Sequence, residues 1–344
     1  MCLTSSDDVT PARLDDVQQR LQLPDRTVAL LRSIPHSPGA LEPMLPDDAA
    51  AAELLKRLGV PDPADTLAAR PKRTTDPELW WVLDRLYQEM VATMGDPAPR
   101  DGFFGWPPIR DERGGPVARQ LYVWLFLTVV PLVRRYHTDH GLPEDVSWDS
   151  LACLGSAMTA ARRLSGRPGL DGVWSLPLAF RGALYPLGRL TFERIAPAPD
   201  GADFPPLPPG TCAIGTHIPD TGPLDPQACD ASFAQARDFL AHHFADRPAA
   251  FICHSWLLDP QLAEYLPAES NLVRFQRRFT LKPNQFERNH NEILQYVFGQ
   301  QNQGPDVPED VLTELPQDTT LQRAYVTHLR SGRHWYGRTG WAPL

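Results

Sequence analysis

The sequence predicts an α/β protein of the α+β kind, in which an all-helical N-terminal domain precedes a mixed sheet flanked by helices. Apolar residues recur at helical spacing through the first half of the chain, and no alternating strand pattern appears before about Val173. Short apolar runs separated by glycine and proline follow, and the stretch from Thr211 to Leu281 has the order strand, tight turn, helix, strand. With 344 residues available, we expect two domains, at 8–148 and 149–344, the second ending in a helical extension.

The clearest predicted helix of the first half begins at Asp76. Asp76 is a suitable cap, Pro77 fits the first helical position, and Glu78 complements the positive end of the helix dipole. The apolar residues that follow share one face: Leu79, Val82, Leu83, Leu86, Tyr87 and Met90. Weaker patterns of the same kind predict helices over 12–23, 26–34, 47–58, 117–136 and 148–164.

In the second half, residues 184–195 predict two short strands that meet near Gly188. A proline-rich loop is expected over 196–210, and a strand over 211–218, which Pro219 ends because proline has no N–H for a sheet ladder. Asp225 and Pro226 predict the start of a helix that reaches Phe244. A second apolar run follows over 249–260 and predicts another strand, and helices are expected over 270–275, 285–298 and 321–330.

Composition excludes several classes of protein. The net charge of -9 disfavours a general nucleic-acid binder, which needs a basic surface. The N-terminal residues lack the basic start and apolar core of a signal peptide, so we expect a cytoplasmic protein. The longest apolar run, 121–133, is too short to span a bilayer and is interrupted by Pro131, which favours a buried core helix. The cysteines, five in all, are irregularly spaced and predict neither disulfides nor a metal site.

Three segments resemble a known family. Gly215–Pro226 reads G-T-H-I-P-D-T-G-P-L-D-P, Cys253–Pro260 reads C-H-S-W-L-L-D-P, and Glu269–Phe275 reads E-S-N-L-V-R-F. Together they resemble the C-terminal domain of bacterial acyltransferases related to the GCN5-type N-acetyltransferases (GNAT), and the helical first half is similar to the N-terminal domain that accompanies it. The resemblance implies a GNAT-like fold and an acyl-coenzyme A (acyl-CoA) donor, with the acceptor unspecified. We expect the acyl group to pass directly to an amine in a ternary complex.

The expected cofactor site follows from that resemblance. One strand of a GNAT-like sheet splays from its neighbour, so that its backbone can bind the pantetheine arm of CoA, and the next helix points its positive end at the pyrophosphate. The expected cofactor-binding residues are Ala213, Ile214, Gly215, Thr216, Ile218, Gly222, Leu224, Gln227, Asn271, Arg274 and Arg278. The loop departs from the usual family signature, because Gly222 stands alone and Pro223 and Pro226 lack an N–H.

Two residues are candidates for the general base. His217 ends the expected cofactor strand and has the right ordinary pKa, although a structural histidine bonded to the next turn is the alternative. Glu193 lies on the strand face opposite Phe192 and Arg194, where an exposed glutamate with no catalytic part is the alternative.

Cys253 and Ser255 share one face of their strand, with His254 on the other. Cys253 is a candidate nucleophile for an acyl-enzyme, with His217 as its base, and a buried structural cysteine is the alternative. Ser255 is a candidate proton donor to the departing thiolate. No tyrosine stands at the position expected for the family's general acid, and Tyr265 lies too early. A non-catalytic CoA-binding or ligand-sensing module therefore stays open as a second function.

No metal cofactor is expected, because His137 and His140 lie at a probable helix end without a third ligand. The expected partner is a small-molecule amine or related acceptor, with no nucleic acid and no membrane span. The acceptor's identity, the acyl-chain length and whether copies of the chain form a homo-oligomer are left open by the sequence.

Overall fold

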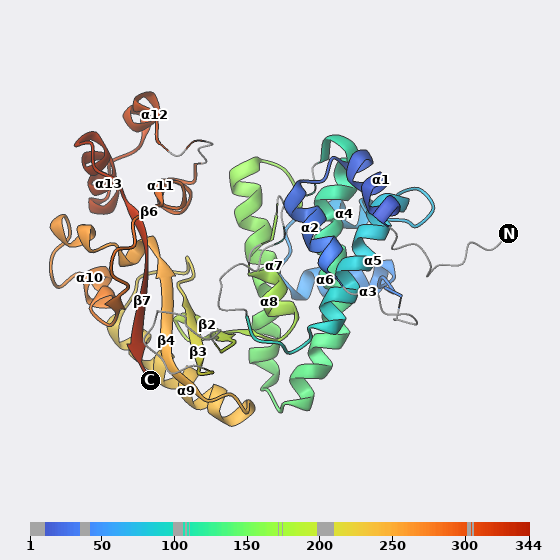
Figure 1. Ribbon diagram of the computed structural model, residues 1–344, viewed down its shortest axis with the longest axis horizontal. Helices are drawn as coiled ribbons and strands as arrows, with labels where there is room; N and C mark the ends of the chain where they lie inside the picture. Colours follow the sequence, from blue (N-terminus) through green and yellow to red (C-terminus); the bar gives the residue numbers. More distant parts are fainter. Residues whose placement is uncertain are drawn as a thin grey trace. The chain divides into compact units, whose positions relative to one another are not determined.

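The computed structural model describes residues 11–34, 42–98, 106, 109, 111–170, 172–173, 175–197, 210–300, 304 and 306–344. The chain forms two compact units, one with the described residues of 1–96 and 103–184 and one with those of 97–102 and 185–344 (Figure 1). The predicted class, helices followed by a mixed sheet, is confirmed. The expected boundary at 148/149 falls inside α7 (Glu144–Ser165), which belongs to the first unit, and the expected start at residue 8 lies outside the described residues.

The described part of the first unit is helical. Its other elements are α1 (Pro11–Leu21), α2 (Asp25–Ser33), α3 (Asp48–Arg57), α4 (Pro63–Ala68), α5 (Pro77–Ala92), α6 (Asp111–Asp139) and α8 (Leu176–Phe180). The six predicted helices are all present, whereas α4 and α8 were not expected. Asp76 does precede α5, but its side chain accepts the N–H of Lys72 rather than capping the helix.

Helix α6 is the core helix of the first unit. Its apolar stretch from Leu121 to Val130 is buried throughout, as the sequence predicted for this region. By length and composition Arg113–Asp139 would pass for a membrane span, but 78% of its most apolar window is buried inside the protein. One or two helices of this kind are common in the cores of proteins that do not cross a membrane, so the burial identifies a packing helix.

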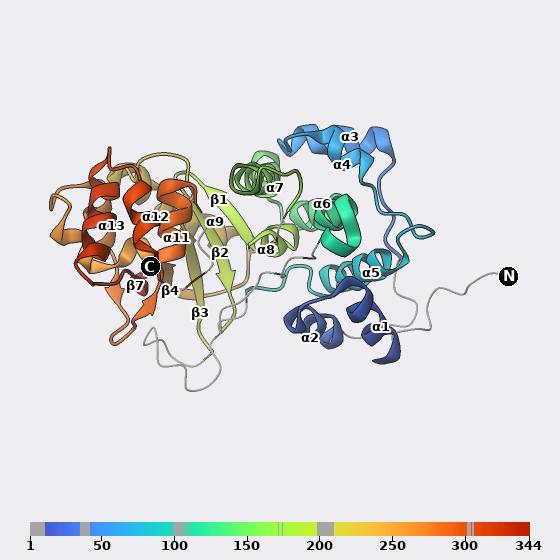
Figure 2. The same cartoon turned by 90° about the horizontal axis from the view of Figure 1, so that it is seen from above.

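The second unit contains a seven-stranded mixed sheet (Figure 2). Its strands are β1 (Leu184–Leu187), β2 (Leu190–Ile195), β3 (Cys212–His217), β4 (Pro248–Ser255), β5 (Thr280–Leu281), β6 (Glu287–Arg288) and β7 (Tyr336–Pro343). The order is β1-β2-β3-β4-β7-β5, with β6 also paired to β7. Strands β3 and β4 pair in parallel, whereas β2 with β3 and β4 with β7 are antiparallel.

Helix α9 (Pro226–His243) covers one face of the sheet. Its Phe233 packs edge-on against Phe251 of β4 at 4.8 Å and Phe192 of β2 at 5.6 Å between ring centroids. Aromatic side chains of this size dominate core energetics, so these contacts fix the helix on the strands. Because side chains alternate along a strand, Glu193 on β2 and Gly215 on β3 point to the opposite face.

The C-terminal part departs most from the predictions. The expected helix over 285–298 is wrong in its first turn, which contains β6, and continues as α11 (His290–Ile293) and the π-helix η3 (Leu294–Phe298). The remaining helices are η1 (Trp256–Leu258), η2 (Pro260–Glu264), α10 (Asn271–Gln276), α12 (Glu309–Glu314) and α13 (Thr320–Arg330). Several of them pack in a second core around buried Trp335 and Tyr325.

Strand β7 was not predicted, because its glycines and proline are residues that strands usually avoid. The glycines have a packing reason. A Cβ on Gly340 would lie 2.8 Å from that of Phe279, so only glycine fits at this point of the sheet.

Candidate active site

Among the described residues of the sheet, His217 and Glu193 form the only histidine–carboxylate ion pair that we find. His217 Nε2 lies 2.9 Å from Glu193 Oε2, and both contacting atoms are shielded from solvent. The Glu193 side chain is 7% exposed and the His217 side chain 41% exposed, so the rest of the imidazole faces outward. The alternative that Glu193 is an exposed strand residue is therefore wrong, because its carboxylate is buried against the imidazole of His217.

The register of β2 and β3 explains this pairing. Glu193 lies opposite Gly215, and Thr191 lies opposite His217. The side chains of Glu193 and His217 are therefore diagonal neighbours on the same face of the sheet. A Cβ on Gly215 would come within 2.3 Å of Glu193 Cγ and 2.4 Å of Oε1. Gly215 therefore leaves the space that the Glu193 side chain fills, a different use from the close approach of a ligand for which the sequence suggested it.

The environment of His217 favours its protonated form. Burial lowers the pKa of the imidazole, but the attraction and hydrogen bonding of Glu193 outweigh it, so the pKa is raised above its ordinary value. A carboxylate that holds one ring nitrogen also orients the ring and leaves the other nitrogen to accept a proton. The pair thus has the chemistry of a general base with its orienting partner.

The pair lies where β3 and β4 part. Among the described residues, their pairing ends at Gly215 opposite Ile252, although β3 continues to His217. Beyond Ile252, β4 runs on beside β7, with Cys253 opposite Gly340 and Ser255 opposite Arg338. Because parallel strands that stop pairing leave backbone groups unused between them, the opening beside His217 can bind an extended ligand through the main chain.

The loop after β3 is held by a residue that the sequence analysis missed. The guanidinium of Arg189, in the turn between β1 and β2, donates to the carbonyl oxygens of Pro219 (3.1 Å), Gly222 (2.6 Å) and Pro223 (2.9 Å). Gly222 has φ of 127°, which favours glycine, and is exposed. Arg189 binds the carbonyl oxygens of this loop and leaves its backbone N–H groups untouched. Within the described chain, the N–H groups of 220–222 have no hydrogen-bond acceptor, so they are available to a ligand. An arginine beside a hairpin glycine was the only signal in the sequence.

Helix α9 begins as predicted, with Asp225 Oδ1 accepting the N–H of Ala228 at 2.9 Å and Pro226 in the first turn. Its N-terminus therefore lies directly after the loop that Arg189 holds. The Asp225 carboxylate occupies one of the few N–H groups that this helix end could offer to a phosphate, since Pro226 has none. The positive end is consequently weaker than in a helix with a glycine-rich start.

The expected cofactor residues fall into two groups. On β3, Ala213 and Gly215 lie on the same face of the sheet as Glu193 and His217. The side chains of Ile214 and Thr216 face α9, so these two residues can reach a ligand only through their backbones. Of the rest, Ile218 is half-buried, Leu224 is buried, and Gly222, Gln227, Asn271 and Arg274 are exposed.

The two arginines among the expected cofactor-binding residues, Arg274 in α10 and Arg278 just after it, are paired with acids. Arg278 donates to Asp230 at 2.7 Å and to the carbonyl of Pro226 at 3.0 Å, which ties it to the first turns of α9. Arg274 lies 4.0 Å from Glu269. Arg278 is thus near the loop, as its proposed contact with CoA phosphates requires, but its guanidinium already has partners.

Cys253 does not share a face with the pair. Phe251 and Cys253 are two residues apart on β4, so both side chains point toward α9. Gly215 and His217 lie on the opposite face of the sheet. Burial raises the pKa of the Cys253 thiol to about 12, so it is neutral at pH 7. The interpretation of His217 as the base of Cys253 is therefore contradicted by the sheet geometry, and a buried structural cysteine fits better.

Two hydroxyl groups considered as acids have structural partners. Ser255 Oγ accepts the N–H of Leu257 at 3.1 Å and caps η1. The hydroxyl of Tyr265 lies 3.0 Å from Nδ1 of His328, within the second core. Neither contact points toward the opening between β3 and β4.

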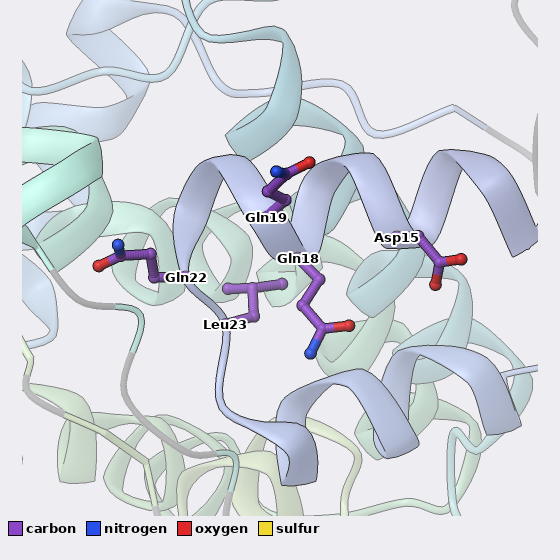
Figure 3. Close-up of a pocket in the computed structure, with 5 residues that line it drawn as sticks. All are labelled: Asp15, Gln18, Gln19, Gln22 and Leu23. Atoms are coloured by element: carbon purple, nitrogen blue, oxygen red, sulfur yellow. The ribbon is translucent and has the colours of Figure 1, made fainter.

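Surface hollows elsewhere lack comparable chemistry. One of about 440 Å³ lies along α1 and is lined by Asp15, Gln18, Gln19, Gln22 and Leu23 (Figure 3). Its lining offers amides and one carboxylate but no base, nucleophile or cation. The pair on β2 and β3 remains the best candidate site.

Comparison with known proteins agrees with the fold. The model of the N-acyltransferase N-terminal domain matches residues 49–182, and that of the GNAT-like C-terminal domain matches residues 184–342. Among solved structures, an acyltransferase in complex with decanoyl-CoA and teicoplanin is 38% identical (TM-score 0.81), and an acyltransferase in complex with CoA and 10C-teicoplanin is 37% identical (TM-score 0.80). Each match covers 96% of this chain and 99% of the other. No curated protein sequence matches the chain.

Proposed function

Because the chain belongs to the acyltransferase family that joins an N-acyltransferase N-terminal domain to a GNAT-like C-terminal domain, we propose that it moves an acyl group from acyl-CoA to a small-molecule amine. The observation that carries the proposal is the His217–Glu193 pair, 2.9 Å apart, at the point where β3 and β4 part. The donor would lie along β3 with its thioester near His217, and its pyrophosphate near the loop that Arg189 holds.

The relatives support this reading of donor and order of events. One was crystallised with decanoyl-CoA and teicoplanin together, which favours simultaneous binding of donor and acceptor, and a mutant relative was crystallised with octanoyl-CoA. We therefore propose a medium-chain acyl group and direct transfer in a ternary complex. The acceptor would be an amine on a small molecule, and the reaction a cytoplasmic one.

The chemistry follows from the geometry. Nε2 of His217 faces Glu193, so Nδ1 takes a proton from the acceptor amine as its nitrogen attacks the thioester carbonyl carbon. Backbone N–H groups at the opening between the strands stabilise the negative charge on the carbonyl oxygen. The tetrahedral intermediate then collapses, the C–S bond breaks, and the thiolate of CoA leaves and takes the proton from the His217 imidazolium, which restores the base. Glu193 stabilises the imidazolium that forms.

Binding and product analysis test the proposal. Isothermal titration with acetyl-, octanoyl-, decanoyl- and palmitoyl-CoA should show binding, strongest for octanoyl or decanoyl. Incubation with the best donor and a panel of amines should then give an acylated product and free CoA by mass spectrometry. Binding of no donor would contradict the proposal, and binding without transfer to any amine would favour the CoA-binding module instead.

A pH profile tests the role of Glu193. The pKa of His217 is raised, and the base works only when neutral, so kcat/KM should fall as pH drops through that pKa. In Glu193→Gln the imidazole of His217 loses the attraction of the carboxylate but stays buried, so its pKa falls. The acidic limb of the kcat/KM profile should therefore move to lower pH. The plateau should also fall about tenfold or more, because the ring is no longer held.

The matched control is Asp246→Asn, which removes a carboxylate paired with Arg194 on the other face of β2. Its acidic limb should stay at the parental pH. Using one acceptor for all variants keeps the acceptor's own titration constant. Identical acidic limbs in Glu193→Gln and the parent would exclude the pair as the source of the pH dependence.

Cys253→Ala should keep most of the activity. The thiol is buried on the α9 side of β4 with its pKa raised to about 12, so it has no path to the thioester. Intact-protein mass spectrometry after mixing with donor alone should show no acyl adduct. A stoichiometric adduct that disappears in Cys253→Ala would establish an acyl-enzyme instead.

A further inference from the structure

Two histidines and an aspartate that the acyl-transfer site does not use lie together in the C-terminal part of the second unit. One ligand atom from each of His290, Asp306 and His334 lies within 4.8 Å of the other two. His290 is the first residue of α11 and is buried, His334 precedes β7 and is half-buried, and Asp306 is exposed. We propose that these three side chains bind a zinc ion.

The backbone carbonyls of both histidines accept hydrogen bonds from neighbouring side chains. The hydroxyl of Tyr325 donates to the carbonyl oxygen of His290 at 3.1 Å, and Gln261 Nε2 donates to that of His334 at 2.9 Å. Tyr325 belongs to the second core, where it is 1% exposed. The imidazole rings of His290 and His334 stack with centroids 5.2 Å apart. Their backbones are thus fixed before any ion binds, which lowers the entropy lost on binding.

The donor set suits zinc. Imidazole nitrogens and a carboxylate oxygen are ordinary zinc ligands, and three protein ligands leave a fourth tetrahedral position for water. At bond lengths of about 2.0–2.2 Å, neighbouring ligand atoms of a tetrahedral site lie roughly 3.4 Å apart. The three side chains would therefore move inward by less than about 1 Å each.

Arg288 is the competing cation. Its Nη1 lies 2.9 Å from Asp306 Oδ1, and its side chain is 46% exposed. A zinc ion bound to Asp306 would displace the guanidinium toward solvent, at little cost because exposed ion pairs of this kind contribute little. With one carboxylate and two neutral imidazoles, the site would bring one negative charge to a dication.

The proposed ion would link elements that are distant in sequence. His290 begins α11, and His334 precedes β7, which is the neighbour of β4 in the sheet. A hydrogen bond already joins the N–H of Asn289 to the carbonyl of Trp335 at 3.0 Å. Zinc would add a second link beside it and stabilise the C-terminal helical region, a structural role that does not depend on acyl transfer.

Metal titration of the full chain without a histidine tag tests the inference. After treatment with EDTA, the protein should bind about one Zn²⁺ per chain by competition with a chromogenic chelator. His334→Gln and Asp306→Asn should each weaken binding about 10- to 100-fold. When free Zn²⁺ is at 100 times the parental Kd, the melting temperature of the parent should rise by on the order of 5 °C, and that of each variant should rise clearly less.

His242→Gln is the control, because His242 and His243 are a second neighbouring pair on α9 with rings 4.6 Å apart. It should bind zinc like the parent. Asp306→Asn changes an exposed residue, so it keeps the test valid if His334→Gln folds poorly. No stoichiometric binding, or parental affinity in both site variants, would overturn the inference.

Discussion

Replacing His217 by glutamine should lower kcat by roughly a hundred- to ten-thousand-fold while donor affinity stays nearly unchanged. Glutamine keeps a polar group near Glu193 but cannot accept a proton from an amine at neutral pH. Since the imidazole of His217 faces both Glu193 and solvent, its loss removes the base and leaves the strand intact. Steady-state kinetics on an identified acceptor and titration with acyl-CoA would separate the two effects.

His254→Gln is the matched control for this variant. His254 lies on the neighbouring strand β4, is exposed, and pairs through Nδ1 with the hydroxyl of Thr339 at 2.9 Å. It should keep near-parental kcat. If His217→Gln lowers melting temperature and donor binding together, with activity falling only in proportion, the histidine is structural. Near-parental kcat in both His217→Gln and Glu193→Gln would mean that neither residue is the base.

Gly215→Ala should have the second largest effect, acting on the pair without changing either member. The new Cβ would lie 2.3 Å from Glu193 Cγ, so the glutamate must leave its place beside His217 or the strands must separate. We expect kcat to fall at least tenfold and the free energy of unfolding to fall by about 1–3 kcal/mol, the usual cost of overpacking. Chemical denaturation and kinetics of the same preparation would measure both.

A double-mutant cycle tests the cause. In Glu193→Ala the space beside Gly215 is empty, so adding Gly215→Ala should cost little further stability. Gly304→Ala controls for the loss of a glycine as such, because Gly304, like Gly215, is outside the left-handed region and its Cβ would meet no atom of the described residues nearer than 3.6 Å. An equal loss of stability in the presence and absence of Glu193 would show that the clash is elsewhere.

Local elements could be predicted because neighbouring residues determine them. The pattern Asp225-Pro226 predicts the start of α9, and the Asp225 side chain does cap it. Gly188 predicts the turn between β1 and β2, and Pro219 predicts the end of β3. Caps, turns and amphipathic spacing act over a few residues, so the residue order alone carries them.

The site was half predictable. His217 and Glu193 were both candidates, but as rivals, because nothing in the residue order says that β2 lies beside β3 with Glu193 opposite Gly215. The burial of Glu193 and the raised pKa of His217 follow from that register. Arg189, which holds the loop, was missed because its three carbonyl partners come from residues about thirty positions later.

The residue order was thus sufficient for six helices of the first unit, the hairpin, strand β3 and the family, since each depends on contacts close in the chain or on short motifs. The tertiary structure decided which strands are neighbours, and with it the pairing of Glu193 with His217, the separation of Cys253 from them and the meeting of His290 with His334. The physical reason is that these contacts join distant residues, and their geometry is set by packing of the whole sheet rather than by local preference.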